Sequence, residues 1–459
     1  MIPIPVCETP EDRLSVGEAS GKLRNETSVT SASLSSRIQE VLEYYALNHQ
    51  FMGSVLVACG DSILFCEGVG WANWEWKIPN ISSSKYRIAC LSMQLTAACI
   101  LLLEEQGRIE LNAPVGRYIE DAPSQWEKIT VFHLLTHTSG LACYTKLSSY
   151  PAVKTRPASP RQLIDLFRDE ELVFLPGAAK SESISNYVLL GHILEILTGK
   201  HYADWVRRNI FTPLGMNDSD YDSNSAIIPN RSSGYVMGAK RPVNASYIHM
   251  SVPFAAGGFI STAPDLFLWL RGLFGGRILR PESLRKMLTP YLNDFAFGWA
   301  VKNTENLISV EHGGNIDGFS TFLTYLPDRE ISVIVLSNFK GAPVGDIALK
   351  LKELALGRAV TLPSERRTIE APPELLGIYA GSYETGGESP QILEITLKGN
   401  RLLLQTNVGA KYPMLMESKD KFFLANPEMQ CEFVRNEDGS ITQLLLWRHG
   451  TCTSAQRLK

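Results

Sequence analysis

The chain has 459 residues, of which 44% are hydrophobic and 20% are charged, as in an ordinary globular protein. This length allows a sizeable core and exceeds that of one ordinary domain, so we expect one large domain and a smaller one. The net charge is −4 and Lys and Arg form no run, which gives no reason to expect nucleic acid or a membrane as a partner.

Neither the N-terminus nor the cysteines indicate export. Residues 1–10 lack the basic start, the continuous apolar segment and the cleavage site of a secretory signal. No stretch of about 18 uninterrupted apolar residues predicts a membrane span. The eight cysteines form no C-x-x-C pair and have no ligand-like histidine spacing, which argues against a zinc site or a disulfide framework. We therefore predict a cytoplasmic protein with free thiols, and no metal or organic cofactor is implied.

The first elements in chain order are an arm, a helix and a hairpin. Residues 1–32 are rich in Ser, Thr, Glu and Pro without an apolar period, which predicts an N-terminal arm. Apolar residues recur at helical spacing over residues 33–46 and predict an amphipathic helix. Two apolar runs around a Gly-Asp pair, within residues 53–68, predict a β-hairpin.

Four strings further along the chain form a recognisable set. They are YRIACLSMQLTA at residues 86–97, which opens a long apolar helix, LLTHTSGL at 134–141, PGAAKSESISNYVLLGHILE at 176–195 and EHGGN at 311–315. Together they resemble the serine β-lactamase, penicillin-binding-protein and D-aminopeptidase or esterase superfamily, in its class C β-lactamase-like branch.

The resemblance implies an α/β (α+β) fold over residues 33–360, with a central antiparallel sheet flanked by helices. Residues 361–373 are charged and contain prolines, as linkers do. Residues 374–459 consist of short alternating segments separated by Gly-Asn or Asp-Gly turns, which predict a small antiparallel β-barrel. Lipocalin-like barrels of this kind follow the catalytic domain in many members of the superfamily.

The catalytic motifs of the superfamily are altered in this chain. Its S-x-x-K dyad reads Cys90 and Met93, and the Tyr and Asn positions of its second motif hold Glu182 and Ile184. The H-x-G form of its third motif is kept at His312. The resemblance therefore puts Cys90, Glu182 and His312 at catalytic positions. The residues expected to face the substrate are Met93, Tyr144, Ile184, Tyr247, Gly313, Gly314 and Asn315.

A thiol at the nucleophile position can work without the lost lysine. A free cysteine has a pKa of about 8.5, so it needs less help than serine, and a helix N-terminus favours its thiolate. Glu182 and His312 can each accept or donate a proton, whereas we interpret His137 as a structural residue that braces the site from behind. We therefore predict acyl transfer or hydrolysis of a small or medium ester, thioester or amide through Cys90, with a small molecule as the substrate.

Two other functions remain open. Glu182, His312 and Cys90 could act as acid and base in an isomerase, a dehydratase or a cyclase. Loss of several motif residues together is also what a non-catalytic pseudoenzyme that binds a ligand would display, because cysteine is often small, buried and inert. The sequence leaves the oligomeric state unknown.

Overall fold

The computed structural model describes residues 31–238, 241–386, 390–406, 411–425, 427–448 and 451–458. The predicted arm falls almost entirely on residues 1–30, which lie outside this part of the chain. The contacts divide the chain into two compact units, Met1–Arg358 and Ala359–Lys459. Each unit is described by itself.

The first unit is organised by an antiparallel sheet of six strands in the order β10-β11-β12-β13-β1-β2. The predicted hairpin is confirmed, because β1 and β2 pair around a turn in which Gly60 has a φ of +56°. β1 and β13 are buried on both faces, since helices cover both sides of the sheet. The strands are β1 (Gly53–Cys59), β2 (Ser62–Val69), β10 (Ala300–Thr304), β11 (Leu307–Ile316), β12 (Phe319–Leu326) and β13 (Ile331–Ser337).

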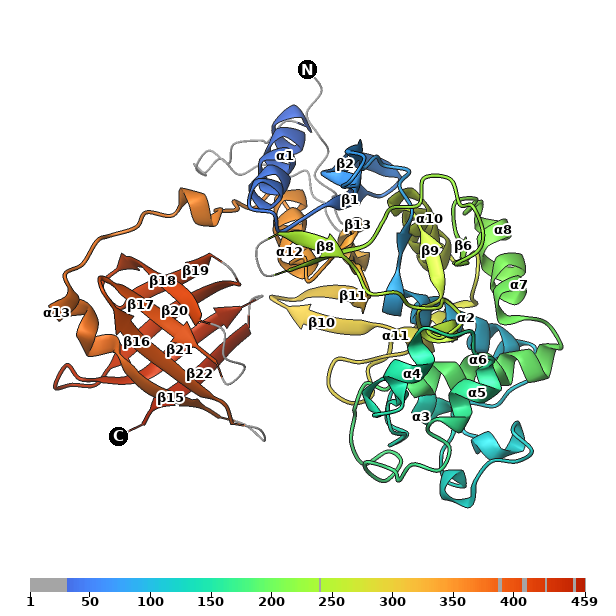
Figure 1. Cartoon of the computed structure of the whole chain (residues 1–459). Coiled ribbons are helices and arrows are strands. Elements are labelled where there is room, and N and C mark those ends of the chain that lie inside the picture. The colour runs from blue at the N-terminus through green and yellow to red at the C-terminus, as the bar shows by residue number, and fades with distance from the viewer. Residues whose placement is uncertain are drawn as a thin grey trace, which may run out of the picture. The chain divides into compact units, whose positions relative to one another are not determined.

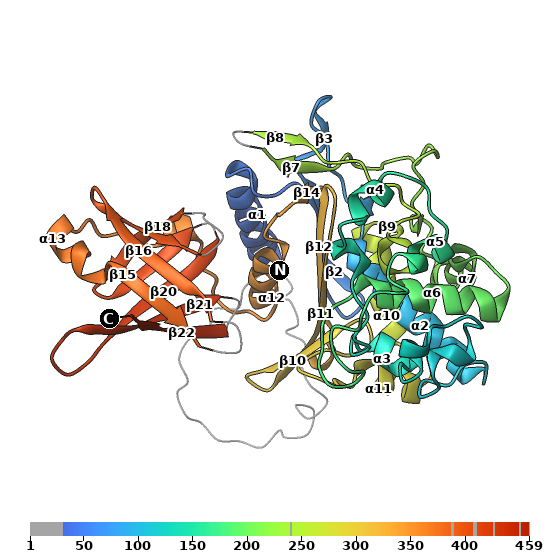
Figure 2. The same ribbon diagram turned by 60° about the horizontal axis from the view of Figure 1, so that its bottom comes forward.

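Helices form a layer on each face of this sheet (Figures 1 and 2). The helices α1 (Ser31–Leu47) and α12 (Val344–Ala355) pack together on one face, where α12 turns a row of buried apolar residues toward β13. On the other face lie α10 (Ala263–Phe274), α2 (Ser92–Glu105) and α6 (Ile184–Thr198). The fold class predicted from the sequence, α/β (α+β) with a flanked antiparallel sheet, is confirmed.

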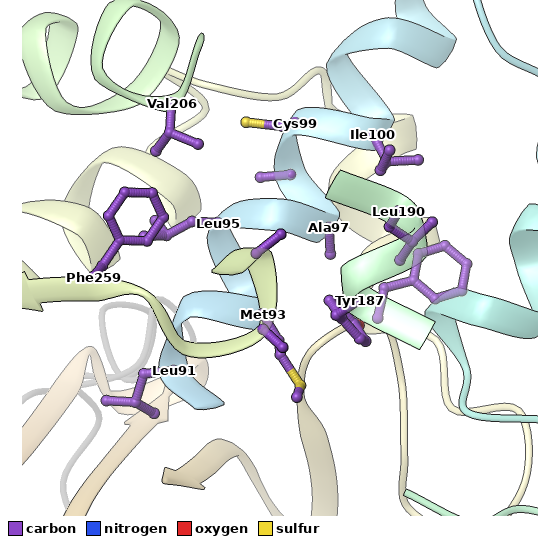
Figure 3. Packing of buried hydrophobic residues seen from close by; sticks show 14 of the residues in the cluster. Leu91, Met93, Leu95, Ala97, Cys99, Ile100, Tyr187, Leu190, Val206 and Phe259 are labelled. Carbon is purple, nitrogen blue, oxygen red and sulfur yellow. The ribbon is translucent and has the colours of Figure 1, made fainter. Parts of the chain in front are cut away.

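The helix α2 is the centre of the core on that second face. Its residues are buried without interruption from Ser92 to Leu101, as expected for a helix that is apolar all round. Figure 3 shows α2 side chains packed among those of α6, with Met93 close to Tyr187. The start of α2 is therefore fixed on all sides by packing.

Shorter elements connect these layers. Three small sheets pair β3 with β4, β9 with β5 and β6, and β7 with β8 and β14. Their strands are β3 (Trp71–Asn73), β4 (Ile78–Pro79), β5 (Tyr86–Arg87), β6 (Asp220–Tyr221), β7 (Tyr235–Met237), β8 (Pro242–Asn244), β9 (Phe259–Ser261) and β14 (Phe339–Lys340). The remaining helices are α3 (Val131–Leu135), α4 (Tyr150–Lys154), α5 (Pro160–Asp165), α7 (Tyr202–Val206), α8 (Thr212–Leu214), α9 (Phe254–Gly257), α11 (Pro281–Leu288) and, in the second unit, α13 (Pro373–Leu376).

The second unit is a closed antiparallel barrel, as predicted. β15 pairs with both β16 and β22, which removes the free edges. Alternate residues of each strand fill the interior. The strands are β15 (Gly381–Thr385), β16 (Ile392–Lys398), β17 (Arg401–Gln405), β18 (Lys411–Ser418), β19 (Lys421–Ala425), β20 (Glu428–Arg435), β21 (Ile441–Arg448) and β22 (Thr451–Arg457).

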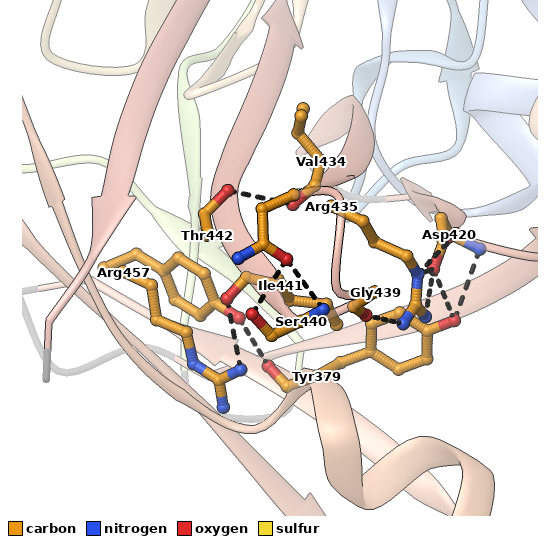
Figure 4. Close-up of polar contacts among 11 residues, drawn as sticks. Tyr379, Asp420, Val434, Arg435, Gly439, Ser440, Ile441, Thr442 and Arg457 are labelled. Carbon is orange, nitrogen blue, oxygen red and sulfur yellow. Dashed lines mark hydrogen bonds and ion pairs between the residues drawn. The ribbon is translucent and has the colours of Figure 1, made fainter.

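A charged cluster joins the barrel wall to the turn that precedes it (Figure 4). The Asp420 carboxylate accepts hydrogen bonds from the Arg435 guanidinium, at 2.6 and 2.9 Å, and from the Tyr379 hydroxyl at 2.9 Å. Arg435 also donates to the Gly439 carbonyl at 2.7 Å. These contacts lower the pKa of the Asp420 carboxyl, with the Arg435 hydrogen bonds as the main cause.

Among the cysteines that the structure describes, the prediction of free thiols is wrong for Cys59. Cys59, at the end of β1, is disulfide-bonded, whereas Cys66, Cys90, Cys99, Cys143, Cys431 and Cys452 are free. Sequence spacing failed here because a disulfide depends on the approach of two residues in the fold. The cytoplasmic location that relied on free thiols stays a prediction. None of the described helices has the length and apolar content needed to cross a bilayer.

Candidate active site

Cys90 lies in a tight turn immediately before α2. The turn is a 3-10 helix over Ala89–Leu91, and Ala89 adopts a φ of +49°, a left-handed conformation that is costly for a residue with a Cβ. Two hydrogen bonds hold the preceding residue: Ile88 N–H donates to the Phe259 carbonyl, and the Thr321 hydroxyl donates to the Ile88 carbonyl, both at 3.0 Å. The surrounding structure thus fixes a strained backbone at the predicted nucleophile.

The end of β11 lies against this turn. β10 pairs with β11 only as far as Glu311, so the part of β11 that begins at His312 extends beyond its neighbour on that side. A Cβ added at Gly314 would stand 2.8 Å from the Cys90 nitrogen and 2.9 Å from the Ile88 oxygen. Only glycine permits this approach of two backbones.

The backbone N–H groups of Asn315 and of Cys90 itself lie near the Cys90 sulfur. Their interaction with the sulfur acts to lower the pKa of the thiol. Burial and then the negative charge of Glu182 act the other way and prevail, and together they raise the pKa of Cys90 to about 12. The expected thiolate at a helix N-terminus is therefore wrong, because the loss of hydration outweighs the amides. Cys90 carries its proton at neutral pH.

Met93 and Ile184 contribute packing at this site. The Met93 side chain is fully buried in the core beneath the turn (Figure 3). Ile184 is half-buried as the first residue of α6. Neither side chain can exchange a proton, so neither can act as an acid or a base at this site.

Glu182 is exposed and close enough to act on its neighbours. Its charge raises the pKa of both Cys90 and Tyr187, although burial is the larger cause for each. In the part of the chain that the structure describes, no hydrogen bond or ion pair links the side chains of Cys90, Glu182 and His312 to one another. The three residues of the predicted set share a region without forming a hydrogen-bonded triad.

His312 is buried on the face of β11 that Gly314 also uses. Burial lowers the pKa of its imidazole to about 4, an interaction with the Gly298 backbone opposes the shift, and the nearby charge of Lys180 adds to it. The Nδ1 atom of His312 has no hydrogen-bond partner. The ring is neutral at physiological pH.

The other residues predicted to face the substrate have different surroundings. Tyr144 is buried and donates its hydroxyl to the Val252 carbonyl at 2.6 Å, which is the arrangement of a packing aromatic. Tyr247 is 54% exposed. Gly313 faces the ring of Phe322, and Asn315 is an exposed residue whose side-chain oxygen accepts a hydrogen bond from the Ser320 hydroxyl at 2.7 Å.

Sequence reasoning missed two residues near the site. Lys180 occupies the position of an aromatic residue in the second family motif, and its ammonium lies 4.4 Å from the centre of the Phe295 ring. The signal in the sequence was a charged residue, Lys180, at a position where the family motif has an aromatic one. Cys143 is a second free, half-buried thiol that raises the pKa of Cys90 slightly, and a lone cysteine gives no such signal.

Two further features of the described chain are relevant to a site, possible metal ligands and a cavity. Among the described residues, no three His, Cys, Asp or Glu side chains are placed to hold a metal ion. A small cavity lined by Phe51, Trp71, Trp74 and Phe339 contains none of the predicted site residues.

A strained turn at the start of a buried helix, set against the end of a sheet strand, is the arrangement expected of a β-lactamase-like fold. The family model described as Beta-lactamase matches residues 45–356, more than half of the chain, and the chain belongs to this family of hydrolases and acyltransferases.

Similar proteins match over most of the chain. Penicillin-binding protein 4* of Bacillus subtilis (strain 168) is 28% identical over 449 residues, which cover 92% of this chain and 98% of that protein. The octameric penicillin-binding protein homologue from Pyrococcus abyssi superposes with a TM-score of 0.66 at 22% identity and covers 92% of this chain and 99% of that one. D-amino acid amidase from Ochrobactrum anthropi SV3 has a TM-score of 0.63 at 22% identity and covers 70% of this chain and 98% of its own.

Proposed function

We propose that the chain is a thiol-dependent hydrolase or acyltransferase that acts on small or medium esters, thioesters or amides, with Cys90 as the nucleophile. The observation that carries this proposal is the close approach of the end of β11 to the Cys90 turn, with the backbone N–H groups of Cys90 and Asn315 near the Cys90 sulfur. Two amides so arranged can hold the oxygen of a tetrahedral intermediate, which is where charge develops during acyl transfer.

Glu182 is the proton acceptor in this proposal. Its carboxylate takes the thiol proton while the sulfur attacks the acyl carbon, and the carbonyl oxygen gains the negative charge. Collapse expels the alcohol, thiol or amine, which receives the proton back from Glu182. Water or an acceptor alcohol or amine then attacks the thioester, loses its proton to Glu182 and releases Cys90, which regains a proton.

We assign this role to Glu182 and not to His312. Glu182 is exposed, and its charge acts on the thiol. His312 is buried, and burial keeps its imidazole neutral by lowering its pKa to about 4. The thiol also keeps its proton at neutral pH, so a nearby group must take that proton as the sulfur attacks, and Glu182 is the carboxylate whose charge acts on the thiol.

A short-chain p-nitrophenyl ester tests the proposal. The expected result is a burst of p-nitrophenol together with one acyl group on the intact protein, mapped to Cys90 and absent from C90A. The matched control is C143S, which removes the other half-buried free thiol near the site and leaves the adduct in place. An acyl group that survives in C90A, or no adduct under conditions where C143S and the native chain both remain folded, would falsify the proposal.

A second function is favoured by one observation. A thiol that keeps its proton at neutral pH is suited to donate it, so Cys90 and Glu182 could serve as acid and base in an isomerase, a dehydratase or a cyclase. Such an enzyme forms no acyl adduct, exchanges substrate hydrogen with deuterated water and loses more activity in E182Q than in C90A.

A further inference from the structure

A chain of hydrogen bonds determines which nitrogen of His137 carries the proton. Leu141 N–H donates to the Ser139 hydroxyl at 3.0 Å, so the Ser139 proton goes to the Asn186 side-chain oxygen at 2.6 Å. The Asn186 amide nitrogen then donates to Nδ1 of His137 at 3.0 Å, and Ser183 N–H points at the same atom from 3.3 Å. A nitrogen that accepts from two donors is unprotonated.

The proton of neutral His137 is therefore on Nε2, which is buried and has no partner. The pKa of His137 is lowered to about 3, mainly by burial, and the ring is therefore neutral. A buried N–H without an acceptor is unfavourable, so such atoms in native proteins usually meet an ordered water. His137 also holds a φ of +57°, which shows that its neighbours impose its conformation.

His312 presents the complementary atom. Its Nδ1 is buried without a partner. The interaction with the Gly298 backbone favours the protonated ring, as expected if the Gly298 carbonyl accepts a hydrogen bond from the ring. Nε2 is the nitrogen left to donate that hydrogen bond. Both imidazoles pack against Phe295, with ring centres 5.1 Å away for His137 and 6.1 Å for His312. One unpaired donor and one unpaired acceptor thus adjoin the same aromatic ring.

We propose that one buried water accepts from Nε2–H of His137 and donates to Nδ1 of His312, which makes His137 a positioning residue that holds His312 neutral with its proton on Nε2. Two polar partners are the minimum for a buried water. The groups with charge or a titratable proton around the pair are Lys180, which covers Phe295, and Tyr187, whose ring centre lies 5.1 Å from that of His137. In the hydrogen bonds described above, neither Lys180 nor Tyr187 accepts from Nε2–H of His137.

The consequence for catalysis rests on the proposed function. With both nitrogens of His312 engaged, the imidazole is withheld from Cys90 and braces the Gly298 turn against β11. A Cβ added at Gly298 would stand 3.0 Å from the Met93 carbonyl oxygen, so this turn touches the first residues of α2. His137 and His312 would then support the nucleophile turn from behind, and Glu182 would remain as the proton acceptor.

Nuclear magnetic resonance of the full-length chain labelled with ¹⁵N-histidine tests the proposal without any substrate. In the native protein we expect both His137 and His312 to be protonated on Nε2 and to stay neutral between about pH 5.5 and 8. A proton on Nδ1 of either ring would overturn the proposal whether or not any variant folds. This readout is separate from acylation of Cys90, so failure here and failure of the proposed function are distinguishable.

The variant H137N removes the N–H at the position of Nε2, because the asparagine side chain is too short to place a donor there, and it keeps an acceptor near the position of Nδ1. Asparagine tolerates the left-handed backbone, and its side-chain oxygen can accept from Ser183 N–H in place of Nδ1. Loss of a hydrogen bond to the neutral ring should raise the pKa of His312 by about one unit, a tenfold change in proton affinity.

Two further variants complete the test. In H137Q the amide nitrogen can replace Nε2–H, so the native behaviour of His312 should return. H192N is the matched control, because His192 is a half-buried histidine with an unpartnered Nδ1 and none of the Phe295 contacts. A folded H137N in which His312 titrates as in the native chain, or H192N producing the same shift, contradicts the proposal.

Discussion

The substitution G314A tests whether the contact between β11 and the nucleophile turn matters for chemistry. The new Cβ would stand 2.8 Å from the Cys90 nitrogen and 2.9 Å from the Ile88 oxygen, both of which are backbone atoms. Ordinary contact begins at 3.4 Å, so the Cys90 amide must retreat by about 0.6 Å. Overpacking of this kind costs about 1–3 kcal/mol of folding free energy.

The catalytic cost of G314A should exceed its cost in stability. Displacement of one amide that holds the oxyanion typically lowers the rate about 10²–10³-fold. We therefore expect a native-like fold with a lower unfolding midpoint in urea, and a rate of Cys90 acylation by the p-nitrophenyl ester that falls about a hundredfold or more.

The neighbouring glycine provides the control for this experiment. A Cβ at Gly313 meets a side-chain carbon of Phe322 at 3.2 Å and its next neighbour at 3.6 Å, so a small movement of one ring relieves it. G313A should acylate at nearly the native rate. The reasoning is refuted if G314A acylates as fast as G313A, or if the two variants lose stability and activity equally.

Three other predictions concern the thiol, a helix cap and the barrel. Alkylation of Cys90 by iodoacetamide should accelerate about tenfold per pH unit until the pH approaches the raised pKa of about 12, as measured by peptide mapping; E182Q should lower that pKa and speed alkylation, yet slow acylation by an ester. T262A removes the side-chain cap of α10 and should cost about 1 kcal/mol in urea unfolding, with no change in acylation by the folded enzyme. Because Arg435 lowers the pKa of Asp420, their contact stabilises the barrel at pH values above the ordinary carboxyl pKa of about 4. This stabilisation is lost as the pH falls through the lowered pKa of Asp420. R435A should therefore flatten this part of the acid-unfolding curve followed by circular dichroism.

The sequence predicted the fold well because its signals are local. The alternation of apolar and polar residues along 374–459 predicts strands with one face inside a barrel, and the turn at Gly60 predicts a hairpin. Each pattern follows from the geometry of a few consecutive residues. These are requirements that neighbouring residues satisfy by themselves.

The electrostatics of the site could not be predicted in the same way. The start of α2 predicted a thiolate, but the protonation of Cys90 depends on how much of its hydration the surrounding elements remove. The burial of His312 and the proton position in His137 depend on segments far apart in the chain. The disulfide at Cys59 could not be predicted for the same reason.

The replaced residues make chemical sense as a set under the proposed function. With Met93 fully buried where the superfamily has lysine, a serine at position 90 would depend on Glu182 alone, and an alcohol is much harder to deprotonate than a thiol. A thiol needs only one nearby acceptor, even with its pKa raised to about 12, and Glu182 occupies the position from which the superfamily's tyrosine acts. The same carboxylate that raises the thiol pKa would also receive its proton, so a single residue would set the resting state and perform the transfer. This double role is why E182Q should change alkylation and acylation in opposite directions, whereas loss of an inert surface carboxylate would change neither.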